Sequence, residues 1–216
     1  MFTGFTQKTI DFMWNIRLNN SKEWFEAHKN EYRRDFQTPM KELGQEVFAR
    51  ITADYGKRGL IHKLSRIYKD ARRVRDGNLY RDNLWFSMEK PSADSSGVLT
   101  FWFDLNPEGW SYGLGYYAAK AVTMEKLRAR IDDNPQEIEK LIDLLHSQDE
   151  FKLDGPEYVR QKQSPTPKTK EWYNKKSFSL IHYGGIGDEL FSREFADRLV
   201  SGYKFLMPFY DYFEIL

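Results

Sequence analysis

Two short aromatic segments, 98–105 and 110–117, stand on either side of the sequence Asn106-Pro107-Glu108-Gly109. Asn, Pro and Gly are turn-forming residues, so the two segments are predicted to pair as an antiparallel β-hairpin. In the first segment both alternating sets of side chains are largely apolar, which predicts a central strand with both faces covered. In the second, one face carries only Ser111 and two glycines. A helix or a ligand is therefore expected to pack closely against that face.

Apolar residues at helical spacing precede this hairpin. They predict a helix over about 6–18, a second helix capped by Asn20, and a third that opens at Thr38 with Pro39 in its first turn and ends at Gly56. Short strands are expected at 84–88 and, later in the chain, at 178–183.

The pattern becomes helical again after the hairpin. Helices are predicted over about 123–131 and after the capping sequence Asn134-Pro135. Residues 154–170 are polar, contain three prolines and show no period, so a long surface loop is expected there. The glycine-rich sequence 184–187 is predicted to be a turn. A last helix is capped by Ser192, and Pro208 is expected to kink or end it.

Alternation of these elements predicts the fold class. The chain has 216 residues, of which 40% are hydrophobic, enough for one sizeable core. We predict a single α+β domain over residues 1–216, with a mainly antiparallel sheet flanked by N-terminal and C-terminal helices.

Several classes of protein are disfavoured by composition. The chain has no cysteine, which excludes disulfides and thiolate chemistry, and its four histidines are scattered, so no metal site is expected. Neither a signal peptide nor an apolar run of bilayer length is present, and a cytoplasmic protein without membrane contact is expected. No nucleotide-binding or hydrolase motif indicates a cofactor or an enzyme class.

The stretch 63–81 concentrates positive charge. It carries seven Lys or Arg against two Asp, a net charge of +5, whereas the whole chain is +1, so the remainder is −4. Apolar residues are threaded through the stretch, which indicates folded structure rather than a disordered tail.

A strand over 64–72 would place alternate side chains on one face. That face would consist of a guanidinium, a phenol, a carboxylate and a second guanidinium, with further basic residues near the following turn. Such a set suits a phosphate or carboxylate group. The candidate ligand-binding residues are Arg66, Tyr68, Asp70, Arg72, Arg75, Tyr80, Arg81 and Lys176.

Two functions fit this face. One is binding of an anionic small molecule, and an enzyme of this kind would use Asp70 or Tyr68 for acid-base chemistry, although a carboxylate flanked by arginines is a poor base. The other is a non-catalytic interaction module that binds RNA or an acidic protein. A concave pocket around Arg66 and Arg72 would favour the small molecule, and a flat, outward face would favour the module.

Five short motifs occur in the order found in one known family. They are Asn19-Asn20 with Glu23-Trp24-Phe25, then Arg66 through Arg72, Tyr80-Arg81, the glycine-rich segment before Tyr117, and Lys176-Ser177-Phe178. Over nearly the whole chain, the sequence resembles the conserved hypothetical family DUF2461. The resemblance implies a shared fold and site and gives no catalytic assignment.

The sequence departs from the family pattern after Asp70. Arg73, Gly77 and Leu79 stand where the family usually has Phe, Lys and Pro. The absence of a lysine at position 77 argues against lysine-based chemistry, while Arg66, Asp70 and Arg72 are retained.

Overall fold

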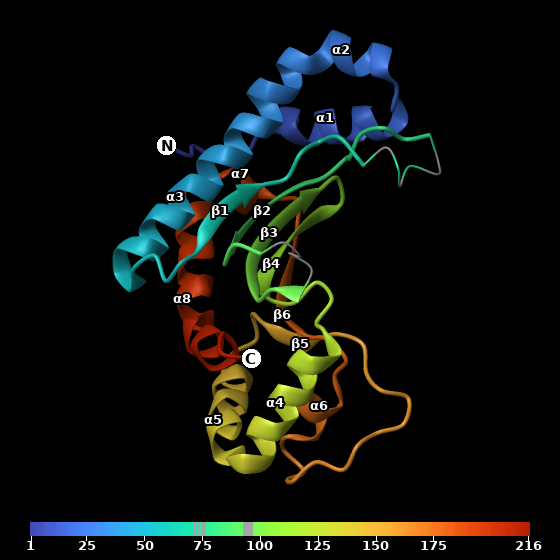
Figure 1. Ribbon diagram of the computed structural model, residues 1–216. Coiled ribbons are helices and arrows are strands. Elements are labelled where there is room, and N and C mark those ends of the chain that lie inside the picture. The colour runs from blue at the N-terminus through green and yellow to red at the C-terminus, as the bar shows by residue number, and fades with distance from the viewer. Residues whose placement is uncertain (71, 73, 75–76, 93–96) are drawn as a thin grey trace. The chain divides into compact units, whose positions relative to one another are not determined.

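The computed structural model describes residues 1–70, 72, 74, 77–92 and 97–216. The protein is α+β, as predicted (Figure 1). Its helices are α1 (Gln7–Leu18), α2 (Lys22–Glu31), the π-helical η1 (Tyr32–Gln37), α3 (Thr38–Tyr55), α4 (Ala121–Asp133), α5 (Pro135–His146), α6 (Lys170–Asn174), α7 (Asp188–Phe191) and α8 (Phe195–Phe213). Its strands are β1 (Ile61–Leu64), β2 (Leu84–Glu89), β3 (Thr100–Asn106), β4 (Gly109–Gly115), β5 (Lys152–Asp154) and β6 (Ser179–Gly185).

In the described part of the chain, the strands form one antiparallel sheet in the order β1-β2-β3-β4-β6-β5. The chain divides into two compact units. The first comprises Met1–Met88, Trp102–Tyr112 and Tyr183–Ser201, and the second comprises Glu89–Phe101, Gly113–His182 and Gly202–Leu216. Strands β2, β3, β4 and β6 and helix α8 contribute residues to both units. The single domain therefore stays a prediction, and each unit is described by itself below.

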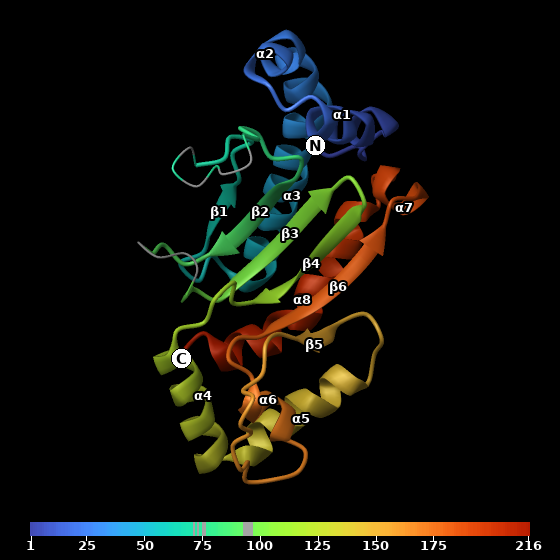
Figure 2. The same ribbon diagram turned by 90° about the vertical axis from the view of Figure 1, so that its right-hand side faces the viewer.

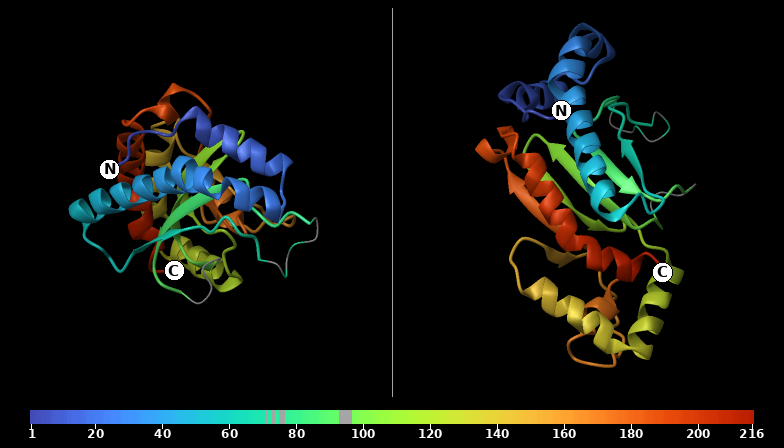
Figure 3. Two further views of the ribbon diagram at one scale, coloured as in Figure 1. Left: turned by 90° about the horizontal axis from the view of Figure 1, so that it is seen from above. Right: turned by 90° about the vertical axis from the view of Figure 1, so that its left-hand side faces the viewer.

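Helix α3 packs on one face of the strands of the first unit (Figure 3, right). Its stripe of Met40, Leu43, Val47 and Ile51 is buried, which confirms the predicted third helix and its end at Gly56. The approach is closest at Gly44, where an added Cβ would lie 2.3 Å from the His62 ring. In Figure 2 the opposite face of these strands is turned to the viewer, and no described helix of this unit crosses it.

Helix α3 begins at Thr38 with Pro39 in its first turn, as predicted, but no break precedes it, because α2 continues through the π turn η1 directly into α3. Pro39 has no N–H to donate to the carbonyl four residues earlier, that of Asp35. The buried Thr9 side chain on α1 donates its hydroxyl to this carbonyl at 2.6 Å instead. Helix α1 thus provides the Asp35 carbonyl with a donor in place of the N–H that Pro39 lacks.

The predicted hairpin is confirmed, since β3 and β4 are neighbours on either side of the turn, and β3 lies inside the sheet between β2 and β4. The prediction that both faces of this strand are covered is wrong. Phe103 and Leu105 are buried, whereas Trp102 and Asp104 on the alternate face are only half-buried. At Gly115 an added Cβ would lie 2.4 Å from the carbonyl oxygen of Phe178, so backbone at the start of β6, rather than a helix or a ligand, fills the space beside this glycine.

The helices of the second unit follow their sequence signals. Helices α4 and α5 form where predicted, with Asn134 and Pro135 at the start of α5, and the chain between β5 and α6 is a long loop, 155–169. The glycine-rich turn is wrong in part, because Gly184 and Gly185 end strand β6.

The predicted end of the last helix at Pro208 is wrong, since α8 continues through this proline to Phe213. The kink, the other predicted effect of Pro208, stays a prediction. Proline inside a helix costs about 3 kcal/mol. Beyond it, Phe209, Tyr210 and Phe213 are buried, and each buried ring contributes about 1.5–3 kcal/mol, so packing outweighs the cost. None of the described helices is both long and apolar enough to cross a membrane.

Candidate functional site

The described residues of the basic stretch lie in the first unit and form two paired arms, one around Tyr68 and one around Tyr80. The predicted strand over 64–72 is wrong: β1 ends at Leu64, and beyond it the two arms pair at a single antiparallel bridge, Tyr68 with Tyr80. The backbone N–H of Lys69 donates to Leu79 O at 2.9 Å, and that of Arg81 to Ile67 O at 2.7 Å. We call residues 63–81 the basic hairpin.

Side chains still alternate along the first arm of the basic hairpin. Ile67 is buried, whereas Arg66 and Tyr68 on either side are exposed. Asp70 and Arg72 satisfy one another in a bidentate pair, with Nε to Oδ1 at 3.0 Å and Nη2 to Oδ2 at 2.9 Å. The Arg72 side chain is 89% exposed. The pair therefore faces solvent, and this bidentate contact engages both oxygens of Asp70.

Two rings of the basic hairpin, Tyr68 and Tyr80, pack against Phe25 of α2. Tyr80 is buried and stacks on Phe25 of α2, with 4.3 Å between ring centroids. Tyr68 meets Phe25 edge-on at 5.6 Å and Tyr80 at 5.3 Å, yet stays 49% exposed. One edge of the Tyr68 ring is thus fixed by packing while the rest of the ring remains accessible.

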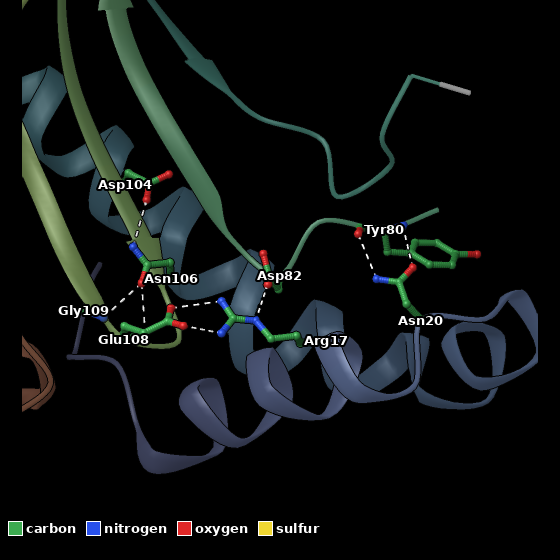
Figure 4. A network of polar contacts seen from close by, with 8 residues as sticks. All are labelled: Arg17, Asn20, Tyr80, Asp82, Asp104, Asn106, Glu108 and Gly109. Carbon is green, nitrogen blue, oxygen red and sulfur yellow. Dashed lines mark hydrogen bonds and ion pairs between the residues drawn. The ribbon is translucent and has the colours of Figure 1, made fainter. Parts of the chain in front are cut away.

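Asn20 ties the loop between α1 and α2 to the basic hairpin (Figure 4). Its Nδ2 donates to Tyr80 O, and Tyr80 N donates to its Oδ1, both at 2.9 Å. The predicted helix cap at Asn20 is wrong, because Ser21 Oγ accepts the hydrogen bond from Trp24 N. Asn20 instead provides both hydrogen bonds that a paired strand would offer to Tyr80.

Arg81 follows the bridge and lies on the ring of Trp85, with its guanidinium carbon 4.7 Å from the ring centroid. Its Nε is buried and has no hydrogen-bond partner among the described residues. A guanidinium stacked on an indole keeps its polar edge available for an anion.

A network of polar side chains lies next to Arg81 in sequence, at the ends of β2 and β3 (Figure 4). Arg17 donates from Nε to Asp82 at 2.5 Å and binds Glu108 with its other two nitrogens. The hydrogen bond from Arg17 lowers the pKa of Glu108, and the same bond raises the pKa of Arg17. This network ties the end of α1 to the turn between β3 and β4.

Asp104 is the carboxyl group of this region that sequence reasoning missed. Asn83 donates to it at 2.6 Å, and Asn106 contacts it at 3.5 Å. Burial raises the pKa of Asp104, while the two asparagines oppose the shift. A carboxyl group of raised pKa close to an arginine is a feature of functional sites. The signal in the sequence was an aspartate inside the apolar segment 98–105.

Two predicted site residues, Arg75 and Lys176, are not among the residues described above. Arg75 lies outside the described residues. Lys176 belongs to the second unit, where it is exposed and lines a pocket of about 370 Å³. Within the described ranges, no group of three His, Asp or Glu residues could hold a metal ion.

Comparison with known proteins identifies a family for this chain. Among curated proteins, no match was found. The family model described as "Conserved hypothetical protein (DUF2461)" matches residues 8–212 of this chain. The match includes Asn20, the basic hairpin and Lys176, and spans nearly the whole sequence. The chain therefore belongs to the DUF2461 family, which has no assigned activity.

Proposed function

We propose that this protein is a non-catalytic binding protein whose basic hairpin binds single-stranded RNA. One observation carries the proposal: the exposed Tyr68 ring lies, in the sequence, between two exposed arginines, Arg66 and Arg72, and packs on the buried rings of Phe25 and Tyr80. Single strands are bound by cations that follow the backbone and by aromatic rings on which bases stack.

An outward surface favours a macromolecule over a small ligand here. The Arg72 side chain is 89% exposed, and Arg66 and Tyr68 also face solvent. A small ligand is normally held in a concave site that covers most of its surface. A strand of RNA needs only a line of charges and rings.

The rings favour RNA over an acidic protein as the partner. An acidic segment would pair with the arginines and gain little from Tyr68. A nucleobase would stack on its exposed face, and Trp85 beneath Arg81 offers a second ring close by in the chain. Catalysis is not part of the proposal, since Asp70 is engaged by Arg72 and makes a poor base.

Fluorescence anisotropy with a labelled oligouridine tests the proposal. Tyr68→Ala should weaken binding about 5- to 150-fold, the worth of one stacked base. Arg66→Gln combined with Arg72→Gln should lower the slope of log K against log salt by about 1.4, because each phosphate contact on a single strand contributes about 0.7.

The matched control is Arg193→Gln, which removes an exposed arginine of the same unit outside the basic hairpin. It should bind as the wild type does. Equal binding by Tyr68→Ala and the wild type would refute the stacking, and preference for polyglutamate over RNA would assign the face to an acidic protein instead.

A second candidate is a small phosphate or carboxylate ligand at Arg81. It is favoured by the buried Nε of Arg81, which lacks a partner among the described residues. Thermal-shift measurements with nucleotides, sugar phosphates and polycarboxylates would detect it, with Arg81→Gln and Arg72→Ala beside the wild type. The candidate fails if no anion stabilises the wild type more than Arg81→Gln.

A further inference from the structure

Arg128 is a buried cation in the second unit. It lies on α4, its side chain belongs to a residue only 8% exposed, and its Nη1 is buried without a hydrogen-bond partner among the described residues. No carboxylate of the described chain forms an ion pair with it. An unpaired buried guanidinium is strongly unfavourable unless another group neutralises it.

Two further cations share one aromatic ring with Arg128. The Arg128 guanidinium carbon lies 5.5 Å from the centroid of the Tyr158 ring, Lys162 Nζ lies 5.2 Å away, and Lys176 Nζ lies 5.6 Å away. Like charges gathered around one ring repel one another. The arrangement is favourable once an anion lies among them.

Four carboxylates of the second unit form ion pairs or hydrogen bonds with residues other than these three cations. Glu157 and Glu171 pair with Lys175 at 3.0 and 3.6 Å. Asp132 accepts a hydrogen bond from the Tyr173 hydroxyl at 3.0 Å, and Glu139 accepts one from Thr166 at 2.6 Å. In the described ranges, no ion pair is formed by Lys162 or Lys176, so the chain supplies no counter-charge to these three cations.

The loop that carries Tyr158 and Lys162 is held in place by Asn174, which is 1% exposed at the end of α6. Its Oδ1 accepts from Lys162 N at 2.7 Å, and its backbone carbonyl accepts from Tyr158 N at 3.0 Å. Figures 1 and 2 show α6 beside α4 with the loop running round it. The backbone of this loop is therefore held in place before any ligand arrives, which lowers the entropy cost of binding.

We infer that Arg128, Lys162 and Lys176 bind the phosphate group of a small molecule. The fork of Arg128 and the two ammonium groups supply three positive charges, enough for a phosphate dianion. Lys176 also lines the 370 Å³ pocket, whose walls include the apolar surfaces of Tyr117, Pro156 and Phe178. The organic part of the ligand lies along this pocket. The inference does not depend on RNA binding by the basic hairpin, which involves different residues.

Thermal-shift titration tests the site with three probes: inorganic phosphate, phenyl phosphate and citrate. Phosphate stabilises many proteins through solvent effects alone, so the quantity of interest is the difference between variants at equal ionic strength. Lys162→Gln and Lys176→Gln, both at exposed positions, should each weaken phosphate binding several-fold, and Lys140→Gln on exposed α5 surface is the matched control.

Arg128→Met separates a binding role from a structural one. If Arg128 serves a ligand, removing its unpaired charge should leave the melting temperature without phosphate unchanged or higher and abolish the shift with phosphate, and Arg128→Lys should restore part of that shift. Phenyl phosphate should shift the wild type more than inorganic phosphate does. A larger shift with citrate would reassign the group to a carboxylate.

The inference is overturned if phosphate and phenyl phosphate stabilise the wild type, Lys176→Gln and Lys140→Gln equally. A lower melting temperature for Arg128→Met, together with no response of the wild type to either probe, would show that Arg128 is structural.

Discussion

Asn20 and Ser21 are neighbours in the sequence with different tasks. Both residue types commonly cap helices, so the sequence at 19–23 is compatible with a cap at either position. What distinguishes them is the partner of Asn20, the backbone of Tyr80, which lies 60 residues further along the chain. Local sequence signals do not identify a partner so distant, and this is why the predicted cap was one residue too early.

Asn20→Ala should therefore damage the basic hairpin rather than helix α2. It leaves the N–H and the carbonyl of Tyr80 without partners, at a cost of about 1–3 kcal/mol in the free energy of unfolding. Hydrogen exchange should show faster exchange of the Tyr80 amide, and urea denaturation gives the cost.

Ser21→Ala is the matched control for this experiment. It removes the helix cap, costs about 1 kcal/mol, and should leave exchange at Tyr80 unchanged. Equal effects of both substitutions on the Tyr80 amide would contradict the role given to Asn20.

Other residues of the candidate sites differ in how far the sequence reveals them. Exposure of Arg66 and Tyr68 around buried Ile67 follows from alternation, even though the segment is not a strand. Arg128 was missed, although a signal exists: it shares helical spacing with Met124, Leu127 and Ile131, all buried. A charge on the apolar stripe of a helix is the pattern that would have found it.

At the scale of elements, the π turn shows how one proline is accommodated. The Asp35 carbonyl loses its helical donor at Pro39 and accepts from Thr9 instead, while Thr9 Oγ1 also accepts from Thr6 N at 3.2 Å. Helix α1 and the π turn are thus linked by a single buried hydroxyl.

Thr9→Val keeps the shape of the side chain and removes this hydroxyl. It should lower the free energy of unfolding by about 0.5–1.5 kcal/mol, because the part-buried Asp35 carbonyl loses this hydrogen bond. In a Pro39→Ala background the same substitution should cost less, because residue 39 then has an N–H that can reach the Asp35 carbonyl.

Urea denaturation of the wild type, both single variants and the double variant measures the coupling between the two positions. We expect at least about 0.5 kcal/mol. Additive costs would show that Thr9 and Pro39 act independently and would refute this explanation of the π turn.

Elements whose start and end are set by nearby residues were predicted well. Asn134 and Pro135 open α5, and Gly56 ends α3, through effects that act within a few residues. The fate of Pro208 depends on the burial of rings that follow it, and the end of β1 depends on pairing with β2. Tertiary contacts determine whether such a helix continues and where such a strand ends. These contacts cannot be inferred from the local pattern of a single sequence.

At the scale of the whole molecule, one helix and several strands run through both compact units, and this favours the prediction of one domain. Helix α8 and four strands each place residues in both compact units without a break in secondary structure. Breaking such an element in one unit removes hydrogen bonds and packing that its continuation uses in the other. We therefore expect one cooperative unfolding transition.

Six tryptophans allow this expectation to be measured. Five belong to the first unit, and Trp172 belongs to the second. With 5-fluorotryptophan labelling, all six native ¹⁹F signals should disappear at the same urea concentration, and Trp172→Phe assigns the sixth. A separate midpoint for Trp172 would mean that the units unfold independently and that the prediction of one domain is wrong.

The π turn also determines how many residues the chain needs between Phe25 and Gly44 in the first unit. A π turn holds one residue more than an α turn, and one residue corresponds to about 100° of rotation about the helix axis. Phe25 before the turn stacks on Tyr80, while Gly44 after it lies against His62. Deleting one residue between them would give a regular α-helix. It would also rotate Phe25 by about 100° about the helix axis relative to Gly44, so that both contacts could not form together. Among family members, we therefore expect the number of residues at 32–37 to be kept more strictly than the residue types.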